Sequence, residues 1–169
     1  SILFKADSLI AGSQADRALI QLDEHLKLIR DAQLVSRINI KKAEAYISLQ
    51  QYSRAQSILE QEASQEPTGT LLGSLRLTEG MLQLYLGNNS AAEEALTEAE
   101  KIFNVAGSTP SFETAKALTY LGLVYFNSGK FSQAEELLLL ALAVRQKLLP
   151  ETHEFIAASY NDLGLVYSK

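Results

Sequence analysis

The stretch that decides the fold is Leu118–Ala141, which reads LTYLGLVYFNSGKFSQAEELLLLA. Its first half places apolar residues at helical spacing, and Gly129 interrupts this pattern before a second apolar half begins. The motif of Leu121–Tyr125 returns 42 residues later as Leu163–Tyr167, with five identities in five. We therefore expect a chain of repeated helix pairs, each joined by a tight turn.

Three earlier copies of this stretch precede it. One lies 42 residues toward the N-terminus, and two more follow at intervals of 37 residues. Small residues recur at one place in the first half of each copy and at one place in the second half. Such small side chains let the two helices of a pair approach closely. The places are Ala6, Ala43, Gly80 and Gly122 in the first halves, and Ala18, Ala55, Ala92 and Ala134 in the second.

The second half of each copy opens with a residue type that favours a helix N-cap. Three of these residues have Gln or Glu three places later, which predicts a capping box. The pairs Glu93-Glu94 and Glu135-Glu136 are then expected in the first helical turn, where acids complement the helix dipole. The predicted caps are Asp16, Ser53, Ser90 and Ser132.

The pattern predicts helices over 2–11, 15–30, 33–49, 52–65, 71–86, 89–105, 112–128, 131–148 and 153–168. They group into repeats at about 1–30, 33–67, 71–107 and 112–149, with a half repeat at 153–169. The last helix is too apolar for a solvating end repeat. We therefore expect the chain to be part of a longer array and to self-associate through this helix.

These residues resemble the tetratricopeptide repeat family. The resemblance rests on Leu121, Gly122, Tyr125 and Ala134, with Pro67 in the place of the closing proline of the second repeat. It implies an all-α fold, a right-handed α-solenoid of about nine helices in a single array over 1–169.

The two C-terminal copies are similar to the kinesin-light-chain subtype of this family. The stretch ALAVRQKLLPETHEFIAASYNDLGLVY carries the likeness, although His153-Glu154 stands where that subtype has His-Pro. Within this subtype, Asn161 matches an asparagine that contacts the backbone of a bound peptide, and Asn127 is a second candidate.

The resemblance implies that the first helix of each pair lines a concave groove that binds a partner. One interpretation is an apolar strip centred on Met81 and Phe126 that receives a helix or an extended peptide. The alternative is that some of these side chains pack between repeats as core. The candidate groove residues are Ile40, Lys41, Glu44, Ile47, Leu77, Met81, Leu84, Tyr85, Lys116, Thr119, Leu123, Phe126, Asn127 and Asn161.

A subtype of this family grips C-terminal carboxylates with asparagines on successive first helices. The equivalent places here hold Asp7, Glu44 and Met81. Because an acid there would repel a carboxylate, we exclude carboxylate tails as partners.

Composition excludes several other function classes. The net charge is −5 and no basic run exceeds Lys41–Lys42, which argues against nucleic acid and anionic membranes. Cysteine is absent and the two histidines, His25 and His153, lie far apart, so we expect no metal and no cofactor. The apolar run Leu137–Val144 is too short to span a membrane. We find no catalytic constellation, and expect a cytoplasmic protein that is not an enzyme.

The leading functional hypothesis is a protein-interaction scaffold that binds a peptide or helix of a partner protein. An alternative is the regulatory arm of a larger bacterial protein, such as a caspase-like protease, a histidine kinase or a transcription regulator. A third is a solenoid that binds a small ligand or lipid.

Overall fold

The computed structural model describes residues 1–106 and 111–169, and these residues form nine helices packed in sequential pairs. The prediction of an all-α repeat fold is therefore confirmed. Gly107, the last residue of the predicted third repeat, lies outside the described residues. The helices are α1 (Ile2–Ala11), α2 (Ala15–Leu26), α3 (Ala32–Ser48), α4 (Tyr52–Ala63), α5 (Gly69–Tyr85), α6 (Asn89–Ala106), α7 (Phe112–Asn127), α8 (Phe131–Leu148) and α9 (Glu154–Tyr167).

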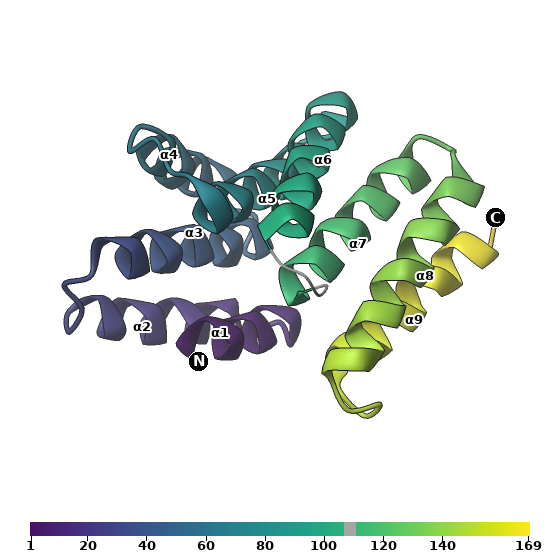
Figure 1. Ribbon diagram of the computed structural model, residues 1–169. Coiled ribbons are helices and arrows are strands. Elements are labelled where there is room, and N and C mark those ends of the chain that lie inside the picture. The colour runs from purple at the N-terminus through teal and green to yellow at the C-terminus, as the bar shows by residue number, and fades with distance from the viewer. Residues whose placement is uncertain (107–110) are drawn as a thin grey trace.

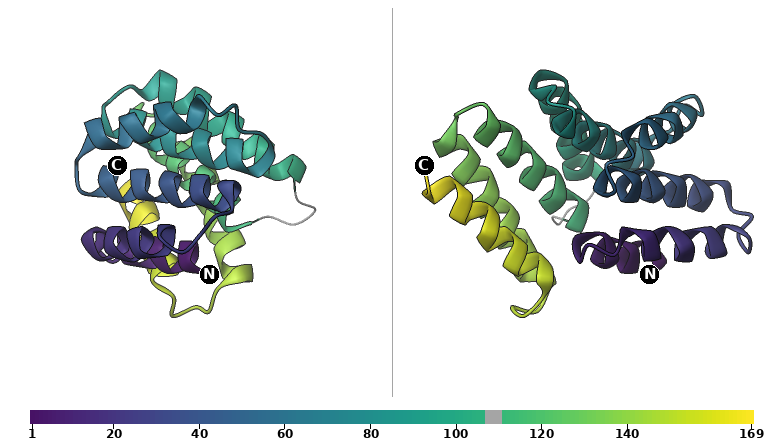
Figure 2. Two further views of the ribbon diagram at one scale, coloured as in Figure 1. Left: turned by 90° about the vertical axis from the view of Figure 1, so that its left-hand side faces the viewer. Right: turned by 180° about the vertical axis from the view of Figure 1, so that it is seen from behind.

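The helices fall into groups that face one another across the molecule. Figure 1 shows α1, α2 and α3 side by side, with α7, α8 and α9 forming a second group and α5 and α6 between them. Seen from behind in Figure 2, the same two groups are at a steep angle to each other. The first helices α1, α3, α5 and α7 contact one another in sequence, and α1 also contacts α9. The array therefore curls far enough to bring its first helix against its last.

The turn inside each complete pair has one repeated geometry. Gly87 and Gly129 adopt the left-handed φ values of 83° and 74°, as predicted, while Ser13 and Gln50 take the same place in the first two pairs. The amide of the following residue donates to a carbonyl five residues back, for example Lys130 N to Tyr125 O at 2.9 Å. This is the Schellman arrangement that closes a helix C-terminus.

This turn makes the predicted N-caps wrong. The residue after the left-handed one already serves as the cap, so three of the second helices begin at Ala15, Tyr52 and Phe131, with α6 beginning at Asn89. The predicted caps Asp16, Ser53, Ser90 and Ser132 consequently lie at the second helical position. The acid pairs of α6 and α8 also lie beyond the first turn.

Side-chain caps occur instead on the first helices. Ser111 and Thr114 form a capping box on α7, and Asp31 caps α3 by accepting from Leu34 N at 2.8 Å. Helix α2 ends at Leu26 with Lys27 as its C-cap, rather than at residue 30 as predicted.

The glycine positions explain how tightly the pairs pack. A Cβ on Gly80 would lie 2.5 Å from Leu96 Cγ, and a Cβ on Gly122 would lie 2.9 Å from Leu138 Cγ. No side chain fits at either place without displacing that leucine. The predicted role of these small residues in close helix approach is thus seen directly in the pairs α5–α6 and α7–α8.

Candidate functional site

Most side chains of the predicted apolar strip are buried in the hydrophobic core. Met81 is 3% exposed and belongs to the main hydrophobic core, where Leu123 packs against it from the edge. Phe126 packs in a separate core around α8 and α9, with its ring 5.6 Å from that of Phe131. The burial therefore matches the alternative interpretation for these residues. The candidate groove residues in the main core are Ile40, Ile47, Leu77, Met81 and Leu84.

The charged residues predicted for the groove do come together. Lys41 Nζ lies 2.7 Å from Asp7 Oδ1 and 2.9 Å from Glu44 Oε2. Lys116 Nζ lies 3.0 Å from the same Asp7 oxygen and also pairs with Glu44. Thr78 donates to the other oxygen of Glu44 at 3.4 Å. We call Asp7, Lys41, Glu44 and Lys116 the charge cluster, and it ties α1, α3 and α7 together.

Burial and pairing act in opposite directions on these groups. Burial alone would raise the pKa of Asp7, but the attraction of Lys116 and Lys41 holds that pKa below its usual value. Burial would lower the pKa of Lys116, yet Asp7 and Glu44 raise it well above normal. Since two cations face two anions, the formal charges of the cluster cancel. The acids at positions 7 and 44 are thus already neutralised, which weakens the repulsion on which the exclusion of carboxylate tails rested.

A cavity of about 410 Å³ opens above the charge cluster. Hydroxyl groups and three aromatic rings line its walls, and Arg37 at its edge donates to Thr70 Oγ1 at 3.2 Å. Four first helices and the end of α6 contribute to it, so no single repeat contains the site. Besides the cluster itself, its lining includes Phe4, Arg37, Thr70, Ser74, Phe103, Ser111, Phe112 and Glu113.

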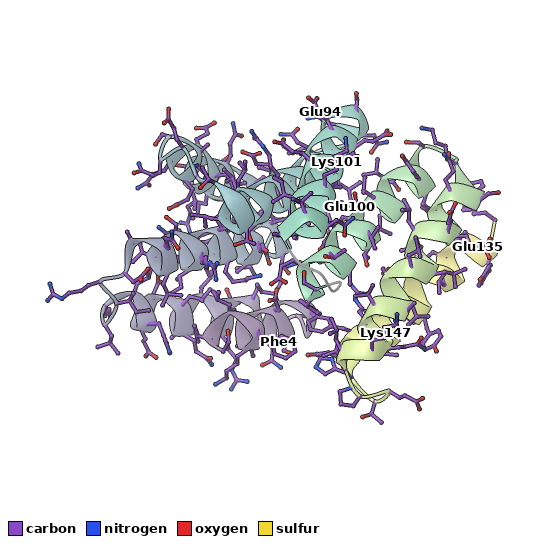
Figure 3. All side chains as sticks on the ribbon, viewed as in Figure 1. Phe4, Glu94, Glu100, Lys101, Glu135 and Lys147 are labelled. Carbon is purple, nitrogen blue, oxygen red and sulfur yellow. The ribbon has the colours of Figure 1, made fainter. Side chains whose placement is uncertain are left out.

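An aromatic cluster closes one side of this cavity. The Phe4 ring of α1 lies 5.6 Å from Phe112 on α7 and 6.2 Å from Phe155 on α9. His153 stacks on Phe155 at 5.1 Å, and its Nδ1 accepts from the amide of Phe155. Phe4 is labelled in Figure 3 on α1. This contact joins the first and last helices, and sequence spacing could not indicate it because 151 residues separate Phe4 from Phe155.

The remaining predicted residues lie on three helices, α5, α7 and α9. Tyr85 is half exposed and lies near Tyr120, and burial raises the pKa of both phenols. Thr119 is buried and donates to the carbonyl of Ala115 at 2.9 Å. Asn127 and Asn161 are both exposed, at the end of α7 and on α9.

A second polar group lies where α8 meets α9. Arg145 is buried and donates to Ser159 Oγ at 2.5 Å and to the carbonyl of Phe155 at 3.4 Å. Burial raises the pKa of Asp162, and the charge of Arg145 partly opposes this. Arg145 was not among the predicted site residues, although a charged residue within the apolar stretch of α8 is a signal for such a polar contact.

Within the described residues, no group of three or more His, Asp or Glu side chains could hold a metal ion. In the same part of the chain, no helix is long and apolar enough to cross a membrane.

Comparisons with known proteins agree with this architecture. Residues 113–169 match the family model described as Tetratricopeptide repeat. The crystal structure of BtubC (BKLC) from P. vanneervenii is similar over 96% of this chain and 69% of that chain, at 21% identity and a TM-score of 0.65. No curated protein sequence matches the chain significantly.

The class of fold is therefore settled. The chain has a tetratricopeptide-like array of helix pairs, and its C-terminal part carries that repeat in sequence. BtubC is itself a kinesin-light-chain-like protein of this kind, in agreement with the resemblance found in the sequence. Arrays of this kind are in general protein-interaction scaffolds with protein partners, and they are typically not catalytic.

Proposed function

We propose that the chain holds a short, extended segment of a partner protein in the cavity between α1, α3, α5 and α7. The observation that carries this proposal is the combination of aromatic and hydroxyl groups around one concave site. Phe4 and Phe112 offer apolar contact, while Thr70, Ser74 and Ser111 offer partners for a peptide backbone.

The size of the cavity favours an extended segment over a helix. Its volume of about 410 Å³ is at the lower end of the range for ligand sites, roughly 300–1,000 Å³. A helix with its side chains is about 10 Å across and would need a wider opening. The charge cluster that lines the cavity has no net formal charge. We therefore expect the cavity to favour neither strongly acidic nor strongly basic peptides.

The test uses a library of short random peptides selected on the intact chain. Selected peptides are then measured against Thr70→Trp, which fills the edge of the cavity, and against Ser57→Trp, its matched control on the exposed side of α4. We expect Thr70→Trp to abolish binding and Ser57→Trp to leave it unchanged, with circular dichroism showing that both variants fold. Peptides that bind Thr70→Trp as well as the unmodified chain would place the binding site elsewhere.

A further inference from the structure

We propose that α1 is a movable strap over the cavity. The pair α1–α2 swings about α3, so that α1 parts from α7 and α9 and returns to them. We call this contact the seam, and it consists of Phe4 and Asp7 on α1 against Phe112, Lys116 and Phe155. That the opened seam admits a partner segment and closes on it rests on the proposed function of the cavity. The movement itself belongs to the free chain and can be measured without a partner.

The seam is held by side chains rather than by close packing of α1 on α7. Both helices are described in full, and no Cα of α1 lies within 8 Å of a Cα of α7. The ring of Phe4 spans this distance to Phe112, and Lys116 Nζ reaches Asp7 Oδ1 at 3.0 Å. Helix α1 comes closer to α9, where the rings of Phe4 and Phe155 are 6.2 Å apart. Phe4 nevertheless remains 38% exposed, so the seam is not packed as a protein core is.

The helices on the two sides of the seam belong to different hydrophobic cores. Ala6 of α1 packs with Ala18 and Leu22 of α2 and with Ile38 of α3. The main core includes α3 from Ile40 onward, together with α5, α6 and α7, and a third core lies between α8 and α9. In Figure 1 the pair α1–α2 lies as a layer alongside α3. Because α3 contributes to both cores, the pair can tilt by sliding on α3 while the main core stays intact.

The charge cluster can divide without leaving an unpaired charge. Lys41 Nζ lies 2.7 Å from Asp7 Oδ1 and joins α1 to α3. Lys116 of α7 pairs with Glu44 of α3. When α1 moves away from α7, Asp7 keeps Lys41 and Glu44 keeps Lys116. A buried charge that loses its partner is strongly destabilising, and this division avoids that cost. Opening therefore gives up only the contact of Lys116 with Asp7 and the ring contacts of Phe4.

The lining of the cavity explains why a bound segment would favour the closed seam. Phe4 contributes to the lining from α1, while Ser111 and Phe112 contribute to it from the start of α7. A segment that touches both sides makes more contacts when the seam is closed, and this difference in affinity shifts the equilibrium toward the closed state. To admit an extended segment, the seam must widen by about 5 Å, the spacing between neighbouring extended chains.

Two spin labels on introduced cysteines measure the opening, because the sequence contains no other cysteine. One label replaces Lys5, which is exposed on α1, and the other replaces Lys147, which Figure 3 labels on α8. Pulsed electron paramagnetic resonance gives the distribution of distances between them. A second pair of labels, at Lys5 and at the exposed Glu24 of α2, lies within the moving pair and serves as the internal control.

Removal of one ring separates the closed state from the open one. In the unmodified chain we expect a short and a long distance between the labels at 5 and 147, differing by about 5 Å or more. Phe4→Ala should enrich the long distance, because it removes the ring that joins α1 to α7 and α9. Phe131→Ala is the matched control, since Phe131 is also 38% exposed and its ring lies 5.6 Å from another ring on α7. It should change neither distance, and circular dichroism checks that both variants fold.

Three results would overturn the movement. The first is one and the same distance in the unmodified chain and in Phe4→Ala. The second is an equal enrichment of the long distance by Phe131→Ala, which would mean that loss of any exposed ring loosens the chain. The third is a longer distance between the labels at 5 and 24, which would mean that α1 leaves α2 instead of moving with it.

A peptide selected on the intact chain tests the closing role. At saturation it should leave only the short distance between the labels at 5 and 147. A bound peptide that leaves the long distance populated would overturn the closing of the seam on its ligand. If no peptide binds, the proposed function of the cavity fails, while the distances in the free chain still decide whether the seam opens.

Discussion

Helices α7 and α9 share the five-residue motif Leu-Gly-Leu-Val-Tyr and have different surroundings. In both, Leu-Gly-Leu-Val-Tyr forms a helix that buries its first leucine and its valine. The glycine of α7 lies beneath Leu138, while Gly164 of α9 faces open space. The motif thus determines the helix and one packing face, and the other face becomes core only where a second helix packs against it, as α8 does on α7.

The two helices also differ at the position of Lys116. Lys116 of α7 joins the charge cluster with Asp7 and Glu44, whereas the residue 42 places later on α9 is Ala158. Helix α7 is therefore anchored at this position by ion pairs, and α9 is anchored to α1 by the aromatic contact between Phe4 and Phe155. Variants that remove one tie at a time can separate these contributions.

The largest expected effect on stability comes from removing the ion pairs that Lys116 of α7 forms. Lys116→Met leaves two buried acids with only Lys41, and we expect it to lower the free energy of unfolding by about 3 kcal/mol. Urea denaturation measures this loss. Lys101→Met on the exposed side of α6 is the matched control and should change little. A stability equal to that of the control would mean that the charge cluster does not hold α7.

A smaller effect is expected from making the same change at the two glycines. Gly122→Leu pushes against Leu138 and should destabilise the chain by about 1–3 kcal/mol. Gly164→Leu replaces a poor helix former in open space and should stabilise it by roughly 0.5–1 kcal/mol. Thermal denaturation of both variants compares them directly. Equal shifts in the same direction would show that the two faces are packed alike.

The smallest expected effect is in the dependence of stability on pH. Because pairing lowers the pKa of Asp7, its contribution is complete above the ordinary value of 3.8 and is lost as pH falls through the lowered value. Lys116 has a raised pKa, so its contribution is complete below 10.5 and is lost only at higher pH. Asp7→Asn should therefore reduce the acid loss of stability seen in urea titrations below pH 3.8. An unchanged acid profile would contradict the pairing.

The helices and their pairing could be predicted from the sequence because each repeat carries its own local signals. The turns were harder to predict from the sequence. Gly87 and Gly129 are residues that favour a left-handed conformation, whereas Ser13 and Gln50 adopt it without being glycine. In all four turns, including those with Gly87 and Gly129, the second helix begins two residues after the left-handed one, so the predicted caps lie at the second helical position. Hydrophobic periodicity locates a helix but does not determine its first residue to within one position, and the identity of the cap depends on that residue.

The site was less predictable, because it depends on how strongly the array curls. The sequence indicates that Met81 lies on a first helix, but neighbouring first helices pack closely enough to bury it. Lys41, Glu44 and Lys116 were expected to line the groove, and the structure joins them to Asp7 across the array. Because 109 residues separate Asp7 from Lys116, no local sequence pattern predicts that they form an ion pair.

The contact between Asp7 and Lys116 also affects how the chain folds. In an open repeat array each repeat contacts only its neighbours, so folding spreads locally and the ends fray independently. Here an ion pair spans 109 residues and an aromatic contact joins α1 to α9. Such distant contacts raise the contact order and slow folding relative to helical arrays of similar size. They also couple the two ends, so that melting of α1 and melting of α9 become a single event.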